Sequence, residues 1–177
     1  MYPAGIEIRL ITKEDASAFY ELIENNRQHL TMYFPKTLKH IINLESTKLF
    51  IANKINGAAK KERYWFIIIS QKENQMIGSL VIKDIDLTVP KCEIAYFIDS
   101  THEGKGITTK AIQWLVNFCF NELYMEKLIL RINPTNEGSK RVALKNGFIK
   151  EGYMKNEYRN GYGELTDVEH YGLARNL

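Results

Sequence analysis

The sequence predicts an α+β (mixed α/β) domain, in which helices flank one sheet. Three apolar strand patterns follow one another over residues 63–70, 76–85 and 92–99, separated by a turn at 72–75 and a break at Pro90. A long helical pattern then leads to a further strand. Because these strands come before a single crossover helix, the order excludes a doubly wound parallel sheet.

The chain begins with a predicted strand and a capped helix. Residues 6–11, IEIRLI, are short and alternating, as a strand requires. Thr12 and Asp15 have the spacing of a capping box, in which each side chain binds the other residue's backbone N–H. We therefore expect a helix that starts at this box and runs to about Arg27.

The remaining elements are predicted from turn and cap residues. Pro35 is expected to fix residues 32–37 as a loop, and Asn43 to cap a helix over about 44–59. Beyond the three strands, the expected order is a helix from the turn at 102–111 to about Leu123, a strand at 128–132, a helix over 136–147 with Asn136 at its cap and Gly147 past its end, and a hairpin of 148–158 and 164–174.

Composition narrows the classes of function. The net charge is +3, from 24 Lys and Arg against 21 Asp and Glu, and no basic run stands out, so we expect no direct nucleic-acid partner. No signal-peptide pattern is present and no apolar run reaches the roughly 18 residues of a membrane span, which predicts a cytoplasmic protein with no membrane partner. Cys92 and Cys119 are expected to be buried free thiols, and the four histidines lack metal-ligand spacing, so no metal is expected.

The turn HEGKGITTKA, residues 102–111, is the first candidate site. It connects an apolar strand to a long helix, whose first backbone N–H groups are unpaired and carry partial positive charge. Gly104 and Gly106 would let a phosphate approach these donors, and Lys105 would add charge. An ordinary strand-to-helix turn is the alternative interpretation. The Rossmann pattern and the P-loop pattern are both absent.

The surroundings of this turn resemble the Gcn5-related N-acetyltransferases. The family pattern is Gln or Arg, two residues, Gly, one residue, then Gly or Ala; this chain has Glu103, Gly106 and Thr108 at those places. A second family signature is an Asn followed eleven residues later by Gly-Phe, which Asn136 and Gly147–Phe148 match. Glu103 and Thr108 depart from the pattern.

Within that superfamily, the chain is similar to the ribosomal-protein alanine and serine acetyltransferases. The resemblance lies in the segment from Asn26–Arg27 to Phe34–Pro35, in the strand CEIAYFID and in the tail GYMKNEYRNGYGELTDVEHYGL. It covers nearly the whole chain. It implies one acetyltransferase domain over residues 1–177, with a mostly antiparallel central sheet and a splayed central strand pair.

The resemblance implies transfer of an acetyl group from acetyl-coenzyme A to an amine. In the family, the strand before the turn binds the pantetheine arm and the turn binds the pyrophosphate. Asn136 would contact this arm or an ordered water, or would act only as a helix cap. Carried over to this sequence, the cosubstrate contacts are Phe97, Ile98, Glu103, Gly104, Lys105, Gly106, Ile107, Thr108, Asn136 and Ser139.

Three residues are candidates for proton transfer. Glu157 matches a glutamate proposed as the base in the related branch, and Glu93, on the strand before the turn, is its rival. Strand alternation places Glu93 on one face with Ala95 and Phe97, where a carboxylate needs a partner or a function. Ser139 matches the serine proposed as general acid, although a serine in the first turn of a helix is also common.

The acceptor is expected to be an amine, in particular the N-terminal amine of a ribosomal protein. By resemblance, the acceptor cleft would be lined by Arg27, Tyr33, Phe34 and Tyr96, with His29 nearby. A polyamine or aminoglycoside acceptor is an alternative, because one scaffold serves many amines. A non-catalytic coenzyme A-binding module is a further alternative. A homodimer is expected by resemblance alone.

Overall fold

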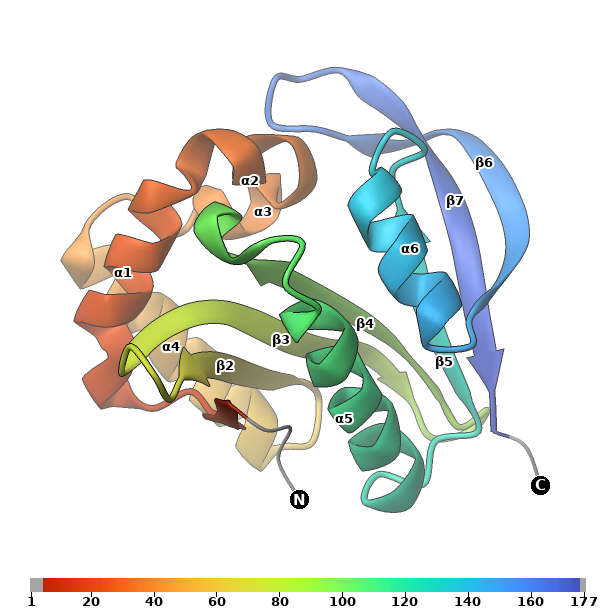
Figure 1. The fold of residues 1–177 in the computed structure, drawn as a ribbon, viewed down its shortest axis with the longest axis horizontal. Helices are drawn as coiled ribbons and strands as arrows, with labels where there is room; N and C mark the ends of the chain where they lie inside the picture. The colour runs from red at the N-terminus through yellow and green to blue at the C-terminus, as the bar shows by residue number, and fades with distance from the viewer. Residues whose placement is uncertain (1–4, 176–177) are drawn as a thin grey trace.

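One seven-stranded sheet organises the molecule, in the strand order β1-β2-β3-β4-β5-β7-β6 (Figure 1). The structure, a computed structural model, describes residues 5–175; the ends of the expected domain, 1–4 and 176–177, lie outside the described residues. Neighbouring strands are antiparallel except β4 and β5, which confirms the predicted α+β class with a mostly antiparallel sheet. The strands are β1 (Ile6–Leu10), β2 (Tyr64–Ser70), β3 (Gln75–Asp86), β4 (Lys91–Ile98), β5 (Lys127–Ile132), β6 (Ile149–Arg159) and β7 (Leu165–Ala174).

Six α-helices flank the sheet, and within residues 5–175 none of them has the length and apolar character to cross a bilayer. A 3₁₀ turn (Lys13–Asp15) leads into the first helix, and a second (Ser100–His102) follows β4. The helices are α1 (Ala16–Asn25), α2 (Arg27–Tyr33), α3 (Pro35–Leu38), α4 (Leu44–Ala59), α5 (Ile107–Asn121) and α6 (Glu137–Lys145).

The predicted caps are confirmed, but the segment between α1 and α4 differs from the expectation. Thr12 and Asp15 form the capping box, and Asn43 caps α4 by accepting the Ser46 N–H at 2.9 Å. The predicted loop over 32–37 is wrong, because it is helical on both sides of Phe34. Pro35 occupies the first position of α3, where its missing N–H removes no helical hydrogen bond.

The helix predicted to reach Arg27 ends earlier, at Asn25. Asn26 is buried, and its side-chain amide donates to the Leu22 carbonyl and to Asp99 Oδ2, both at 2.9 Å. Its carboxamide oxygen accepts the Ser100 N–H at 3.0 Å. These hydrogen bonds connect the end of α1 to the segment after β4, and α1 ends where they form.

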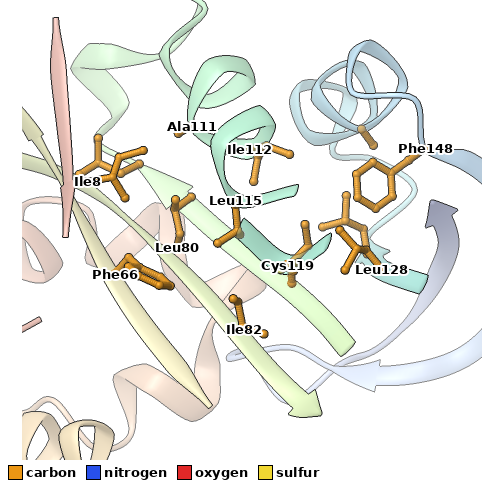
Figure 2. Close-up of a cluster of buried hydrophobic side chains, with 14 of the residues drawn as sticks. Ile8, Phe66, Leu80, Ile82, Ala111, Ile112, Leu115, Cys119, Leu128 and Phe148 are labelled. Atoms are coloured by element: carbon orange, nitrogen blue, oxygen red, sulfur yellow. The ribbon is translucent and has the colours of Figure 1, made fainter. Parts of the chain in front are cut away.

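Two cores lie on opposite faces of the sheet. Beneath α5 and α6, Ile112 and Leu115 belong to one buried cluster with Leu80 and Ile82, and Phe148 lies beside Leu128 in the same cluster (Figure 2). On the other face, α1 and α4 pack against alternate residues of the same strands, including Phe97. The expected alternation on β4 is confirmed, because Ile94, Tyr96 and Ile98 belong to the α5–α6 face while Ala95 and Phe97 belong to the α1–α4 face.

The central pair β4–β5 separates after three residue pairs. Lys91, Cys92 and Glu93 pair with β5 residues 127–129, whereas 94–98 have β3 as their partner strand. The expected splayed central pair is therefore confirmed. Its consequence is that one edge of residues 94–98 presents backbone groups that no neighbouring strand occupies.

Candidate active site

A cleft of about 950 Å³ opens where β4 and β5 separate. It is lined by residues from both faces of β4, such as Tyr96 on the α5–α6 side and Phe97 on the α1–α4 side. The cleft therefore passes through the plane of the sheet. It gives two molecules access to one point from opposite sides.

The glycine turn forms one wall of this cleft. Gly104 and Gly106 have φ of +73° and +75°, in the left-handed region that favours glycine. Open space surrounds the position that a Cβ would take at each of them. Gly106 is the N-cap of α5, and no described side chain caps its N–H groups. An anion can therefore approach the backbone donors without meeting a side chain.

Glu103 and Lys105, two charged residues of this turn, differ in position. Glu103 lines the cleft and its carboxylate lies 3.5 Å from His29 Nε2. Lys105, expected to add positive charge at the turn, is exposed and is not among the cleft-lining residues. Ile107 and Thr108 line the cleft as expected, at the start of α5.

Asn136 and Ser139 meet at the first turn of α6, on the same side of the sheet. Asn136 Oδ1 accepts the Ser139 N–H at 2.9 Å, so Asn136 is a helix cap, and both residues line the cleft. The Tyr96 hydroxyl donates to the Ser139 carbonyl at 3.3 Å, and burial raises the pKa of Tyr96 to about 12. Tyr96 was expected among the acceptor contacts, but it lies on the α5–α6 face with the cosubstrate candidates.

The two candidate carboxylates lie in one ion-pair network across the opening. Glu93, with 11% of its side chain exposed, lies 2.8 Å from Lys83 Nζ and 2.8 Å from Arg131 Nε. Glu157 lies 2.7 Å from His170 Nε2 and 4.0 Å from Arg131 Nη1. Both glutamates line the cleft. Arg131 thus lies between them, and His170 is the nearest ion-pair partner of Glu157.

A contact between α2 and the final hairpin borders the cleft. The Tyr158 hydroxyl donates to the Tyr33 carbonyl at 2.9 Å, and burial raises the pKa of Tyr158 to about 12. Phe34 meets Phe97 edge-on with ring centroids 5.6 Å apart. Tyr33, Phe34 and Tyr158 all line the cleft.

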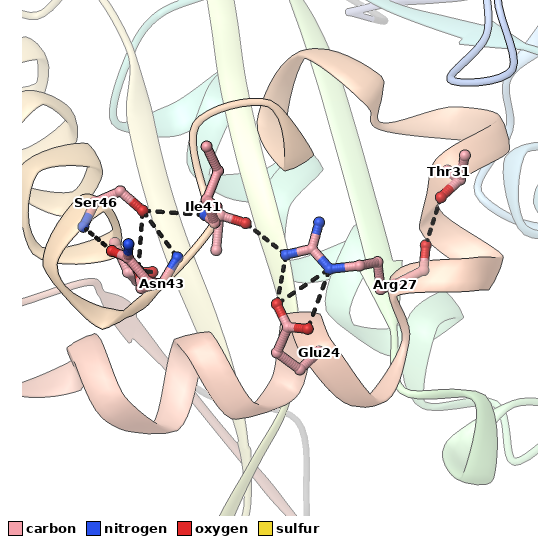
Figure 3. Close-up of polar contacts among 8 residues, drawn as sticks. Glu24, Arg27, Thr31, Ile41, Asn43 and Ser46 are labelled. Atoms are coloured by element: carbon pink, nitrogen blue, oxygen red, sulfur yellow. Dashed lines mark hydrogen bonds and ion pairs between the residues drawn. The ribbon is translucent and has the colours of Figure 1, made fainter.

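Arg27, expected to line the acceptor cleft, is not among its lining residues. Its guanidinium forms an ion pair with Glu24 and donates to the Ile41 carbonyl at 2.5 Å (Figure 3). In this position it links α1 and α2 to the segment before α4. Its observed contacts are therefore structural.

The lining residues that were not predicted as site residues include Lys54, Trp65, Arg131 and Tyr158. His170 was not predicted either; it contacts Glu157 but does not line the cleft. Arg131 carried a signal, because it is a charged residue that interrupts the apolar strand LILRI. Lys54 and Trp65 lie in an ordinary helix and strand and carried none. Within residues 5–175, no three His, Cys, Asp or Glu side chains are grouped to hold a metal ion.

Comparison with known proteins defines the class. Residues 6–149 match the acetyltransferase (GNAT) domain, so the chain belongs to the GNAT acetyltransferase family. It is 30% identical over 165 residues to the probable N-acetyltransferase YjcK of Bacillus subtilis, covering 92% of this chain and 91% of that protein. It is 26% identical over 153 residues to the ribosomal-protein-serine acetyltransferase of Escherichia coli, covering 85% and 83%.

A solved structure shares the fold. The ribosomal L7/L12 alpha-N-protein acetyltransferase RimL, in complex with coenzyme A, superposes with a TM-score of 0.90 at 22% identity, covering 98% of this chain and 96% of that one. The protein is therefore an N-acetyltransferase of the GNAT fold, related to the ribosomal-protein acetyltransferases.

Proposed function

We propose that this enzyme transfers the acetyl group of acetyl-coenzyme A to the N-terminal amine of a protein, by direct attack within a ternary complex. The supporting observation is that one cleft reaches both faces of β4 at the splay. A thioester held on the α5–α6 side and an amine entering from the α1–α4 side would meet there without a covalent enzyme intermediate. The relative named as a ribosomal-protein-serine acetyltransferase favours a protein acceptor.

The chain offers a suitable site for the cosubstrate. The turn from Gly104 to Thr108 supplies backbone donors and open space for a pyrophosphate. The unpaired edge of β4 around Phe97 and Ile98 can hydrogen-bond a pantetheine amide as an added strand would. Acetyl-coenzyme A supplies the thioester carbonyl, and a backbone N–H of this edge would donate to the oxyanion.

Glu157 is the general base in this proposal. Its carboxylate lies beside His170 at 2.7 Å, so a proton taken from the acceptor ammonium can pass into a pair of titratable groups. Glu93 is held by two cations at 2.8 Å each, and this pairing assigns it to fixing Lys83 and Arg131. The guanidinium of Arg131 would then lie between the two carboxylates and balance their negative charge.

Ser139 is assigned to the departing thiolate. It lies in the first turn of α6, where the Asn136 cap fixes its backbone, and it lines the cleft on the cosubstrate side. Its hydroxyl can donate a hydrogen bond to the sulfur that leaves the acetyl carbon. This donation stabilises the thiolate until it takes up the second proton that the acceptor nitrogen loses as the amide forms.

Thiol release from acetyl-coenzyme A tests the proposal, with peptides that begin with Ser or Ala compared against N-acetylated copies of the same peptides. We expect release only with the free N-terminus. Equal activity with a blocked peptide carrying an internal Lys would contradict N-terminal specificity. Turnover of polyamines alone would assign the enzyme to small amines.

A further inference from the structure

The acceptor side of the cleft contains a group of basic side chains without ion-pair partners. Lys54 on α4 and Arg63 just before β2 line it together with Lys36 and His40 from the α3 region; Lys54 is half-buried and the other three are exposed. We refer to Lys36, His40, Lys54 and Arg63 as the cationic corner. No ion pair between described residues includes any of the four.

The carboxylates of the cleft are all engaged elsewhere. The pairs are Glu93 with Lys83 and Arg131, Glu103 with His29, Glu137 with Lys140, and Glu157 with His170. The cationic corner is thus a positively charged part of the cleft, and the acidic side chains that line the cleft already have ion-pair partners. A surface lysine can leave such a place for water at little cost, so the position of Lys54 requires an explanation.

Lys54 is half-buried against two aromatic rings. Its Nζ lies 4.3 Å from the centroid of Phe50 and 5.4 Å from that of Trp65. Burial, and then the charge of Arg63, lower the pKa of Lys54 to about 8. Lys54 is half-buried while Arg63 is exposed, so the cost falls mainly on Lys54, and an anion bound between the two cations would reduce it.

Trp65 supplies an independent observation. Its side chain is buried, it lines the cleft, and its indole Nε1 is the one buried side-chain polar atom among residues 5–175 that has no hydrogen-bond partner. Buried polar groups are nearly always paired. An oxygen-rich anion beside Lys54 could accept this N–H as well.

The backbone holds Arg63 in place. A Cβ added at Gly57 on α4 would lie 2.8 Å from Arg63 Cγ, so the arginine stem lies directly against the helix at that glycine. Gly57 is buried in the last turns of α4. Glycine within a helix lowers its stability relative to alanine, and here it makes room for the arginine.

We infer that the acceptor of this enzyme carries an anionic group beyond its amine, bound by the cationic corner and Trp65. For a protein acceptor, this group is an acidic side chain within the first few residues of its N-terminus. The inference rests on the proposed function for the identity of the amine. It disfavours polyamine acceptors, whose charges would meet like charges.

Rates with three sets of acceptors test this inference. The first set pairs peptides that have Asp or Glu near a free N-terminus with the same peptides carrying Asn or Gln. The second set consists of small amines that carry a carboxylate or phosphate, and the third is spermidine. We expect kcat/KM about 10- to 100-fold higher for each acidic peptide than for its amide copy, the range of a charge-assisted hydrogen bond. Lys54→Met and Arg63→Gln should each reduce that preference to about threefold or less, with little change for the amide peptides.

Lys48→Met is the matched control, because Lys48 is on the same helix, pairs with Glu45 on the surface and does not line the cleft. It should keep the full preference. Equal rates for acidic and amide peptides, or a better rate with spermidine, would overturn the inference and leave acetyl transfer intact. Turnover of small anionic amines but of no peptide would instead overturn the protein acceptor and retain the anion site. If no amine reacts, calorimetry measures how tightly the acidic peptides and their amide copies bind to protein saturated with coenzyme A. The inference is overturned if neither peptide binds or if both bind equally.

Discussion

The two sides of the cleft differ in whether backbone groups or side chains supply most of their contacts. On the α5–α6 side, the contacts come from backbone: two glycines with positive φ, the uncapped start of α5 and the free edge of β4. On the α1–α4 side, they come from side chains: the network around Glu93 and Glu157, and the cationic corner. A backbone site can serve one constant cosubstrate in many relatives, whereas side chains can change with the acceptor.

The largest expected effect comes from a substitution on the α1–α4 side of the cleft. Glu157→Gln keeps the size of the side chain but removes its basicity, so kcat should fall by about 10²- to 10³-fold, as for loss of a general base. Steady-state rates measure this fall, and the KM for acetyl-coenzyme A should change little, because that site lies on the other side of the sheet.

Glu151→Gln is the control for Glu157, since Glu151 is on the same strand, pairs with Lys127 at 2.7 Å and does not line the cleft. Its rates should match the wild type. A normal kcat for Glu157→Gln together with a low kcat for Glu93→Gln would transfer the role of base to Glu93.

The next largest effect is expected on the α5–α6 side of the cleft, at the glycine turn. Gly106→Ala forces a side chain into the left-handed region and places a methyl group in the open space at the turn, so the KM for acetyl-coenzyme A should rise about tenfold or more. Gly5→Ala shares the positive φ, +88°, and the open surroundings, but lies before β1. Both variants should lose about 1 kcal/mol of stability. An unchanged KM for Gly106→Ala would exclude the turn as the phosphate site.

A smaller effect is expected from pH. The folded-state pKa of Lys54, about 8, lies below its ordinary value of 10.5, so its protonated form is disfavoured by folding. The resulting cost is fully present below pH 8 and is removed as pH rises from about 8 to 10.5. Chemical denaturation should therefore show wild type gaining stability relative to Lys54→Met over that window.

The same titration should change substrate choice. Arg63 is the charged group that acts on Lys54, and Lys36 and His40 line the same cleft. The preference in kcat/KM for an acidic peptide over its amide copy should decline several-fold above about pH 8, as Lys54 loses its charge. A preference that stays constant to pH 10 would show that Lys54 does not contact the anion.

The smallest effect concerns Gly57. Gly57→Ala places a methyl group against the Arg63 stem and should lower the acidic-peptide preference about two- to threefold, while the helix gains about 0.5–1 kcal/mol from the alanine. Thermal unfolding and the peptide panel measure the two changes together. A loss of preference with a large loss of stability would instead indicate general damage to α4.

The same division explains what could be predicted from the sequence. The fold class and the positions of the strands followed from strand periodicity, caps and turn residues, whereas the splayed pair was expected from the family resemblance. The glycine turn could be found because backbone sites require particular residues in consecutive positions. Lys54, Trp65 and His170 could not, because Lys54 meets Trp65 and His170 meets Glu157 only after the chain has folded, and nothing in their local sequence distinguishes them.

The errors have local physical causes. The helix at α1 stopped before Arg27 because Asn26 makes contacts with Asp99 and Ser100, which are more than 70 residues away in the sequence. The loop expected at 32–37 is helical because proline is compatible with the first position of a helix. Both depend on the tertiary setting and not on local propensity.

A structure of the ternary complex with coenzyme A and an acidic N-terminal peptide tests the central claim most directly. The account predicts a pyrophosphate on residues 104–108, a peptide N-terminus at the β4–β5 opening beside Glu157, and a carboxylate within about 4 Å of Lys54 Nζ. A peptide that binds on the α5–α6 face, or whose acidic side chain points away from Lys54 and Arg63 into solvent, would contradict it.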